Sequence, residues 1–207
     1  MIVVGVFAAG IWLSGDQVEP AWLRFYSAAV FAATVAAAFW ERYLWRWSPM
    51  QRIERVPSNI RGTWQGTLTS LWVDPLSGES PQGKTVYLVV RQTFSDASVV
   101  LLTDESRSGS TLAAVSMING ERTLDYVYIN RPDPRVEHRS RMHHGSVVLD
   151  ISGRPGSRLR GRYWTDRESR GELDFTRRHK MLADDFDSAA RLFDGPPAES
   201  RTVQSGE

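Results

Sequence analysis

The stretch LRGRYWTDRESRGELDF, residues 159–175, alternates apolar and polar side chains on both sides of a polar centre. Successive side chains of a β-strand point to opposite faces, so Leu159 and Tyr163 share one face and the arginines between them share the other. Leu173 and Phe175 alternate with acidic residues in the same way. The pattern predicts an antiparallel hairpin with one face in a core and its outward arginines paired with carboxylates across the hairpin.

Short alternating segments of this kind continue from residue 60 to residue 178, separated by glycine, proline and polar turns. We expect eight strands, at residues 62–72, 85–94, 98–104, 111–118, 123–129, 143–151, 159–165 and 172–177. Asn119-Gly120 predicts a tight hairpin turn, because both residue types tolerate positive φ. Eight short strands close most simply into an up-and-down antiparallel barrel, which either fills its interior or holds one small ligand.

The alternation also predicts which side chains enter the barrel. Trp64, in the sequence Gly62-Thr63-Trp64, is expected to pack inward and close the barrel floor. If Leu159 is in the core, Tyr163 and Thr165 line the interior toward one end, where His143 also points inward. Arg167 and Arg170 then lie at the rim of that end, and the long connection over residues 131–141 is the one that could lie across it as a lid.

Composition excludes several classes of site. The chain has no cysteine, so it has no disulfide, thiolate metal site or cysteine nucleophile. His143 and His144 are adjacent, so on a strand they point to opposite faces, and no metal site is expected. The sequence contains no nucleophile elbow, no glycine-rich phosphate loop and no pair of carboxylates spaced for acid–base catalysis. We therefore expect neither an enzyme nor a cofactor.

The charge is balanced overall but unevenly distributed. A net charge of +1 argues against binding to DNA or RNA. However, twelve arginines fall between Arg131 and Arg178, while the whole chain has only two lysines. Arginine suits bidentate contacts with phosphate or carboxylate. The alternative interpretation is a solvated barrel exterior with mixed charges.

The first 47 residues predict a membrane anchor. Residues 21–40 form an apolar run with one charge, Arg24, and a tryptophan near each end, which matches the roughly 20 residues of a spanning helix. Residues 1–15 form a shorter uncharged run, and a short acidic link joins the two. Arginines follow the second run and are absent from the link, so the positive-inside rule places the rest of the chain in the cytoplasm. A cleaved signal peptide is the competing interpretation, but the chain begins without a basic segment.

These patterns predict four parts: a two-helix transmembrane anchor at residues 1–47, a juxtamembrane linker at 48–59, a cytosolic β-barrel at 60–181 and a disordered tail at 182–207. The tail is rich in Asp, Pro and Ser, and at most one or two helical turns are expected near Phe186–Phe193.

Three blocks of sequence, in this order after a two-helix anchor, resemble a known family. They are Asn59–Gly66, His143–Gly145 and Gly161–Leu173. Together they are similar to the membrane-anchored β-barrel effectors of cyclic-oligonucleotide-based antiphage signalling (CBASS), the SMODS-associated proteins with two transmembrane helices. The resemblance implies a lipocalin-like barrel that binds a cyclic dinucleotide made by a partner nucleotidyltransferase. It further implies that the liganded protein forms homo-oligomers and disrupts the bacterial inner membrane through contact with its lipids.

The chemistry of the opening stretch is compatible with such a ligand, because arginines can bind its phosphates and aromatic rings can stack on its bases. We expect the ligand contacts to come from Tyr163, Trp164, Thr165, Asp166, Arg167 and Arg170, with Tyr128, Asn130 and His143 as further candidates.

Two other functions remain open at this point. A membrane-anchored, lipocalin-like barrel for a lipid or another small hydrophobe predicts an apolar cavity with few charges. A scaffold that binds a partner through the outer barrel surface predicts a filled interior and an exposed apolar patch.

Overall fold

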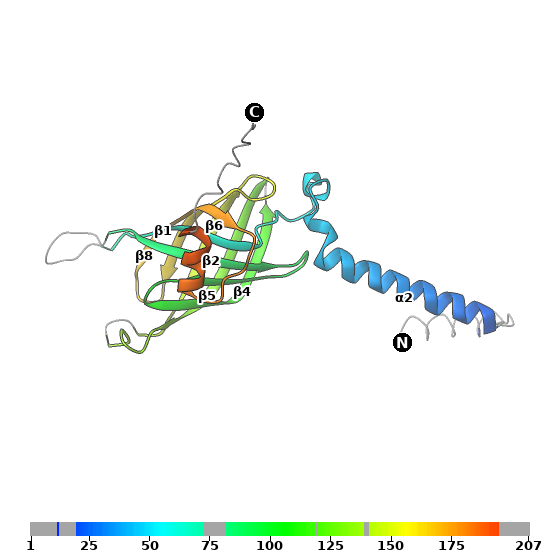
Figure 1. The fold of residues 1–207 in the computed structure, drawn as a ribbon, viewed down its shortest axis with the longest axis horizontal. Helices are drawn as coiled ribbons and strands as arrows, with labels where there is room; N and C mark the ends of the chain where they lie inside the picture. Colours follow the sequence, from blue (N-terminus) through cyan, green and yellow to red (C-terminus); the bar gives the residue numbers. More distant parts are fainter. Residues whose placement is uncertain (1–11, 13–19, 73–81, 119, 139–140, 195–207) are drawn as a thin grey trace, which may run out of the picture. The chain divides into compact units, whose positions relative to one another are not determined.

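The computed structural model describes residues 12, 20–72, 82–118, 120–138 and 141–194. The chain divides into two compact units between Trp45 and Arg46 (Figure 1). Each unit is described by itself below.

The first unit contains one long helix, α2 (Pro20–Arg42), which is followed by the short 3-10 helix η1 (Leu44–Arg46). Phe31, Val35 and Phe39 are more than half exposed and lie four residues apart, so they form one apolar stripe along α2. In the described part of the chain, no helix is both long and apolar enough to span a membrane. The first predicted span lies outside the described residues except for Trp12, and the two-helix anchor stays a prediction.

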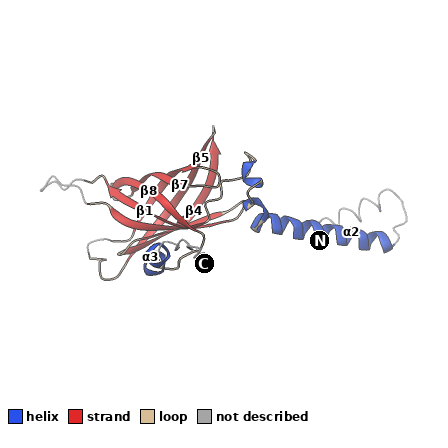
Figure 2. Cartoon of the chain, turned by 45° about the horizontal axis from the view of Figure 1, so that its top comes forward, coloured by secondary structure: helices blue, strands red, loops and turns tan. Residues whose placement is uncertain are grey.

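The second unit is a closed barrel in which every strand pairs with its sequence neighbours and β8 pairs with β1 (Figure 2). The strands are β1 (Gly62–Ser70), β2 (Lys84–Gln92), β3 (Ala97–Leu102), β4 (Ser106–Ile118), β5 (Glu121–Pro132), β6 (His143–Ser152), β7 (Arg158–Thr165) and β8 (Arg170–His179). All neighbouring pairs are antiparallel, which confirms the predicted eight-stranded up-and-down barrel.

The barrel interior is apolar over most of its length. One continuous buried cluster includes Trp64, Leu88, Leu124, Leu149 and Phe175, which come from five different strands. On the hairpin that opened the sequence analysis, Leu159 and Phe175 are in this cluster, whereas the arginines of β7 are exposed. The predicted alternation is therefore confirmed.

Two of the outward arginines of β7, Arg158 and Arg160, form ion pairs with β8, and both pair diagonally. Arg158 binds Asp174 through two hydrogen bonds, and the Nη2 of Arg160 lies 3.7 Å from the Oε2 of Glu172. In the strand register, by contrast, Arg160 is opposite Asp174. Long arginine side chains reach a diagonal neighbour as easily as the residue directly opposite.

Trp64 closes one end of the barrel, as predicted. Its side chain is fully buried, and its indole Nε1 donates a 2.8 Å hydrogen bond to the carbonyl oxygen of Ile60. The guanidinium of Arg178 lies 5.3 Å from the centre of a Trp64 ring and donates to the carbonyl oxygens of Asn59, Arg61 and Gly156. Tryptophan and arginine together fill the closed end and satisfy its backbone carbonyls.

The linker before the barrel is fixed to this closed end. It contains the short 3-10 helix η2 (Met50–Arg52), in which the Gln51 side chain is buried and bonded to Pro57 and Asn59. Arg154, in the β6–β7 turn, donates from Nη2 to three carbonyl oxygens of residues 53–56.

The chain after the barrel differs from the prediction of a tail that is disordered from residue 182. Residues 182–194 are ordered and end in helix α3 (Phe186–Asp194), which packs against the outside of β2 and β3 (Figure 2). Phe193 stacks on Tyr87 at 5.8 Å, and Arg177 lies over the Phe193 ring. The helix lies where one or two helical turns were expected. The acidic residues at the start of this helix made its sequence look polar, although its apolar side chains form the face that packs on the barrel. Residues 195–207 lie outside the described residues.

We predict that Phe193→Ala lowers the free energy of unfolding by about 2–4 kcal/mol, because the ring is nearly buried between Tyr87 and Arg177. Chemical denaturation of the full-length chain measures the change. Arg191→Ala, on the exposed side of the same helix, serves as the control and should change the value by less than about 0.5 kcal/mol. Equal effects of the two changes would contradict the packing described for α3.

Candidate ligand-binding site at the barrel mouth

A cavity of about 160 Å³ occupies the barrel interior at the end opposite Trp64. Its apolar wall consists of Leu68, Leu101, Val147 and Leu173. Two aromatic side chains, Tyr128 and Tyr163, and seven polar side chains complete the lining. The polar residues are Thr103, Ser106, Ser108, Asn130, His143, Thr165 and Ser169. We call this space the mouth cavity.

Two glycines make room for the two tyrosines. Tyr128 is opposite Gly145 in the register of β5 and β6, and Tyr163 is opposite Gly171 in that of β7 and β8. A Cβ atom on either glycine would overlap the facing tyrosine ring. The two rings therefore lie flat against the barrel wall beside the cavity, a placement that only glycine permits.

Five of the nine candidate residues line the mouth cavity: Tyr128, Asn130, His143, Tyr163 and Thr165. Burial raises the pKa of both tyrosines, so their hydroxyl groups stay protonated at neutral pH. His143 lies edge-on to Tyr128 at 6.5 Å, and its Nδ1 is 3.1 Å from the carbonyl oxygen of Arg141.

The other four candidates do not line the mouth cavity. Trp164 is half exposed on the outer barrel surface, opposite Arg170 in the β7–β8 register. Arg170 and Arg167 are exposed at the same end of the barrel. The side chain of Asp166 is engaged in the fold, because its Oδ2 accepts a 3.0 Å hydrogen bond from the backbone N–H of His144. Their roles in binding stay predictions.

Thr165 has a structural role as well as a place in the lining. Its hydroxyl lies 2.7 Å from that of Ser169 and accepts a hydrogen bond from the backbone N–H of Arg167. These bonds fix the β7–β8 turn and bring Ser169 into the cavity wall.

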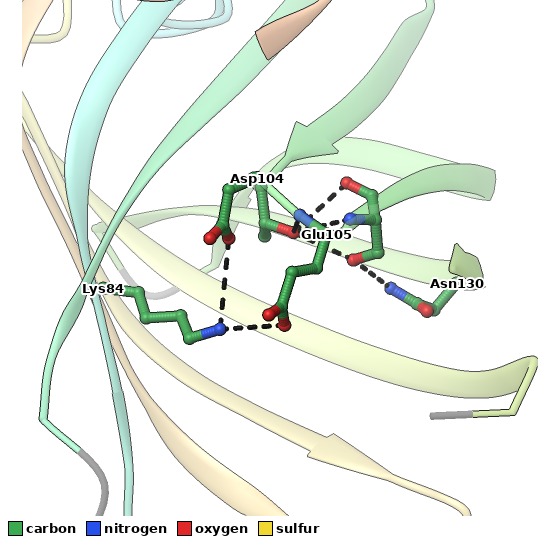
Figure 3. Close-up of polar contacts among 6 residues, drawn as sticks. Lys84, Asp104, Glu105 and Asn130 are labelled. Atoms are coloured by element: carbon green, nitrogen blue, oxygen red, sulfur yellow. Dashed lines mark hydrogen bonds and ion pairs between the residues drawn. The ribbon is translucent and has the colours of Figure 1, made fainter. Parts of the chain in front are cut away.

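The polar wall contributed by the β3–β4 turn was not predicted. Thr103 bonds to the backbone and side chain of Ser106 across this turn, and Asn130 donates from Nδ2 to the hydroxyls of Ser106 and Ser108. Lys84 forms ion pairs with Asp104 and Glu105 of the same turn (Figure 3). Serines alternate at positions 106, 108 and 110, but these positions fall between the strands expected at residues 98–104 and 111–118, where serine is typical of a turn.

The described residues of the long connection after β5 do not contact the cavity. Asp133 forms an ion pair with Arg135 and bonds through its backbone to Glu105, beside the β3–β4 turn. The prediction that this connection forms a lid is therefore not supported by residues 133–138 and 141–142, while residues 139–140 lie outside the described part.

Comparisons with known proteins identify the family. The model of the Cap15 cyclic dinucleotide receptor domain matches residues 55–177, which is more than half of the chain. The chain belongs to the Cap15 family. It is also 30% identical over 152 residues to CD-NTase-associated protein 15 of Staphylococcus schleiferi, covering 73% of this chain and 78% of that protein.

The Cap15 match includes every residue that lines the mouth cavity. It ends at Arg177, so α3 lies beyond the matched residues. The match thus covers the barrel strands as far as Arg177, and the comparison with the family model does not include α3.

We predict that Asp166 titrates below the usual carboxyl pKa of about 3.9. The hydrogen bond from the His144 backbone N–H is the largest cause, and it lowers the pKa because it favours the charged carboxylate. The folded pKa is lower than the unfolded one, so the contribution to stability is present above about pH 3.9 and is lost as the pH falls through the folded pKa.

Carboxyl NMR titration of the full-length chain tests this prediction. His144→Ala retains the backbone donor and should therefore keep most of the lowering. If Asp166 in the unmodified chain titrates at or above the usual carboxyl pKa, the hydrogen bond from His144 does not stabilise its carboxylate.

Proposed function

We propose that this chain is a CBASS effector that binds a cyclic dinucleotide at the mouth cavity, oligomerises and disrupts the inner membrane. The observation that carries the proposal is a tyrosine-lined cavity at the open end of a barrel whose family is that of cyclic dinucleotide receptors. The related protein of Staphylococcus schleiferi is named for its association with a CD-NTase. A nucleotidyltransferase of this kind is therefore the proposed source of the ligand.

The chemistry of the site matches the ligand in two respects. Tyr128 and Tyr163 offer ring faces for a base, and a stacked base contributes about 1–3 kcal/mol. Arg141, Arg167 and Arg170 are exposed around the mouth, and a hydrogen bond to a charged group contributes about 1.5–3 kcal/mol. One stacked base and two or three charged contacts together contribute about 4–12 kcal/mol, a range that includes the roughly 8 kcal/mol of micromolar binding.

The alternative of a lipid-binding barrel is less well supported. A drug-sized ligand needs a pocket of about 300–1,000 Å³, and most of the barrel below the mouth cavity is filled by the apolar cluster. The lining also includes the buried Oδ1 of Asn130, which has no partner within the described residues and which an acyl chain could not satisfy.

An apolar row on the outer surface supports self-association. Leu112 is opposite Val127 in the register of β4 and β5, and Trp164 follows in the same row on β7, beyond Ser146. Val148 lies next to this row, and all four apolar side chains are substantially exposed. Exposed apolar patches of this type are typical of protein interaction sites.

The membrane part of the proposal rests on the sequence. Residues 1–47 are predicted to insert in the bacterial inner membrane as a two-pass anchor with the barrel in the cytoplasm. The exposed stripe of Phe31, Val35 and Phe39 gives α2 an apolar surface for lipid or for a second copy. We propose that the protein acts as a sensor rather than an enzyme, since assembly alone can convert binding into membrane damage.

Dye-loaded liposomes containing the full-length chain test this proposal. Addition of a cyclic dinucleotide is expected to release dye and to increase the size of cross-linked species. Leu112→Asp should reduce both effects and leave ligand binding intact, because Leu112 is outside the barrel and away from the cavity. Thr176→Ala, on the exposed face of β8, is the control. Ligand binding without release or assembly would contradict the effector mechanism while leaving the sensor intact.

A further inference from the structure

The mouth cavity is too small for a whole cyclic dinucleotide. Its volume of about 160 Å³ is close to the roughly 150 Å³ of a cavity that holds a single benzene molecule. Pockets that enclose a drug-sized ligand are at least about 300 Å³. The cavity therefore admits one ring system, and the rest of a cyclic dinucleotide must stay outside against the rim.

The polar groups of the cavity come from two sides of the barrel. Hydroxyls and the single amide of the lining come from the β3–β4 turn, β4 and β5, whereas Thr165, Ser169 and His143 lie on the β6–β8 side. Asn130 is the amide, and only 7% of its surface is exposed. A ring that enters the cavity beside the tyrosines can present an edge to Asn130 and to the two serines bonded to it.

Asn130 forms hydrogen bonds through its amide nitrogen but not, in the described part of the chain, through its amide oxygen. Its Nδ2 donates to Ser106 at 2.9 Å and to Ser108 at 2.8 Å, which occupies both amide hydrogens. Its Oδ1 is buried and has no hydrogen-bond partner within the described residues. A buried acceptor without a partner is unfavourable, and a donor supplied by a ligand relieves that cost.

We infer that the mouth cavity holds one base of the cyclic dinucleotide and that Asn130 selects a base with an exocyclic amino group. This inference rests on the proposed function and names the part of the ligand that the cavity recognises. Because both amide hydrogens of Asn130 are occupied, it cannot make the two-bond contact with adenine that needs a free donor and acceptor. One bond, from ligand N–H to Oδ1, remains.

An exocyclic amino group suits this acceptor better than a ring N–H does. The amino group of adenine, guanine or cytosine projects beyond the ring edge and has two hydrogens. The N3–H of uracil lies between two carbonyl oxygens, which would approach Oδ1 and repel it. Adenine-, guanine- or cytosine-containing ligands should therefore bind more tightly than cyclic di-UMP.

Calorimetric titration of the full-length chain in detergent tests the inference. The ligands are cyclic di-AMP, cyclic di-GMP and cyclic di-UMP. They are compared with analogues in which inosine replaces guanosine, or purine riboside replaces adenosine, at one or both positions. Loss of both amino groups should weaken binding about tenfold or more. Loss of one should weaken it only about twofold, because the intact base still enters in one of the two orientations.

The variants separate recognition from folding. Asn130→Val should bind the parent ligand and the doubly substituted analogue equally, so that the discrimination is lost. Gln65→Leu, which removes a half-buried amide from the outer surface, should retain the discrimination. If Asn130→Val weakens every ligand by the same factor and still discriminates, the inference is wrong and the proposed function stands.

Two other results would overturn the inference. Tightest binding of cyclic di-UMP would exclude selection of an amino group. A tenfold loss of affinity on replacing one base, followed by a similar further loss on replacing the second, would show that both bases are recognised. If the unmodified chain binds no cyclic dinucleotide, the proposed function fails first and the inference fails with it.

Discussion

Trp64→Ala is expected to lower the free energy of unfolding of the barrel by about 3–5 kcal/mol. The indole is fully buried at the closed end, where it donates to Ile60 and lies beneath the guanidinium of Arg178. Its removal leaves a cavity and exposes the Ile60 carbonyl, and it takes away the ring on which Arg178 rests. Burial already lowers the pKa of Arg178 to about 10, so this cation depends on the ring and on the carbonyls it binds.

Denaturant titration followed by circular dichroism measures this loss. Trp72→Ala is a matched control, because Trp72 follows the other end of β1 and is half exposed. It should change the free energy of unfolding by no more than about 0.5 kcal/mol. Similar losses for the two tryptophans would mean that Trp64 does not organise the closed end.

Tyr163→Ala is expected to weaken cyclic dinucleotide binding by roughly tenfold to a hundredfold. The Tyr163 ring lies flat in the cavity wall against Gly171, where it can stack on a base. Loss of one stacked base costs about 1–3 kcal/mol, which corresponds to that range of affinity. Calorimetry on the full-length chain gives the affinity, and thermal unfolding shows that the variant is folded.

Two controls identify the cause of the loss. Tyr163→Phe retains the ring and should retain most of the affinity. Arg162→Ala changes the neighbouring residue, whose side chain is exposed on the outer face, and should leave binding unchanged. If Arg162→Ala and Tyr163→Ala weaken binding equally, the ligand does not bind inside the mouth.

Alternation alone was enough to predict the barrel, because each strand buries one face and exposes the other. The same rule correctly directed Tyr163 and Thr165 inward, whereas Trp164, which was named as a ligand contact, lies on the outer surface. It failed where the interior becomes polar: the hydroxyls of Ser106 and Ser108 line the cavity and are held by Asn130, an arrangement that depends on a partner on another strand. Local pattern cannot reveal such a pairing.

Two other features also depend on long-range contacts. The Asp166 carboxylate accepts a hydrogen bond from His144 on the adjacent strand, 22 residues earlier, and its expected contact with the ligand stays a prediction. Helix α3 has a short and acidic sequence, and it is ordered because Tyr87, Val89 and Leu102 form an apolar surface on the outside of the barrel. Neither contact can be predicted from the local sequence, because each joins residues that only the folded barrel brings together.

The most direct test of the account is calorimetric titration of the unmodified full-length chain with a panel of 3′–5′ cyclic dinucleotides. The account predicts that at least one member binds with micromolar or tighter affinity and that the corresponding linear mononucleotides bind far more weakly. A folded chain that binds no member of the panel would contradict it, and the stretch at residues 163–171 would then be only the solvated end of a hairpin.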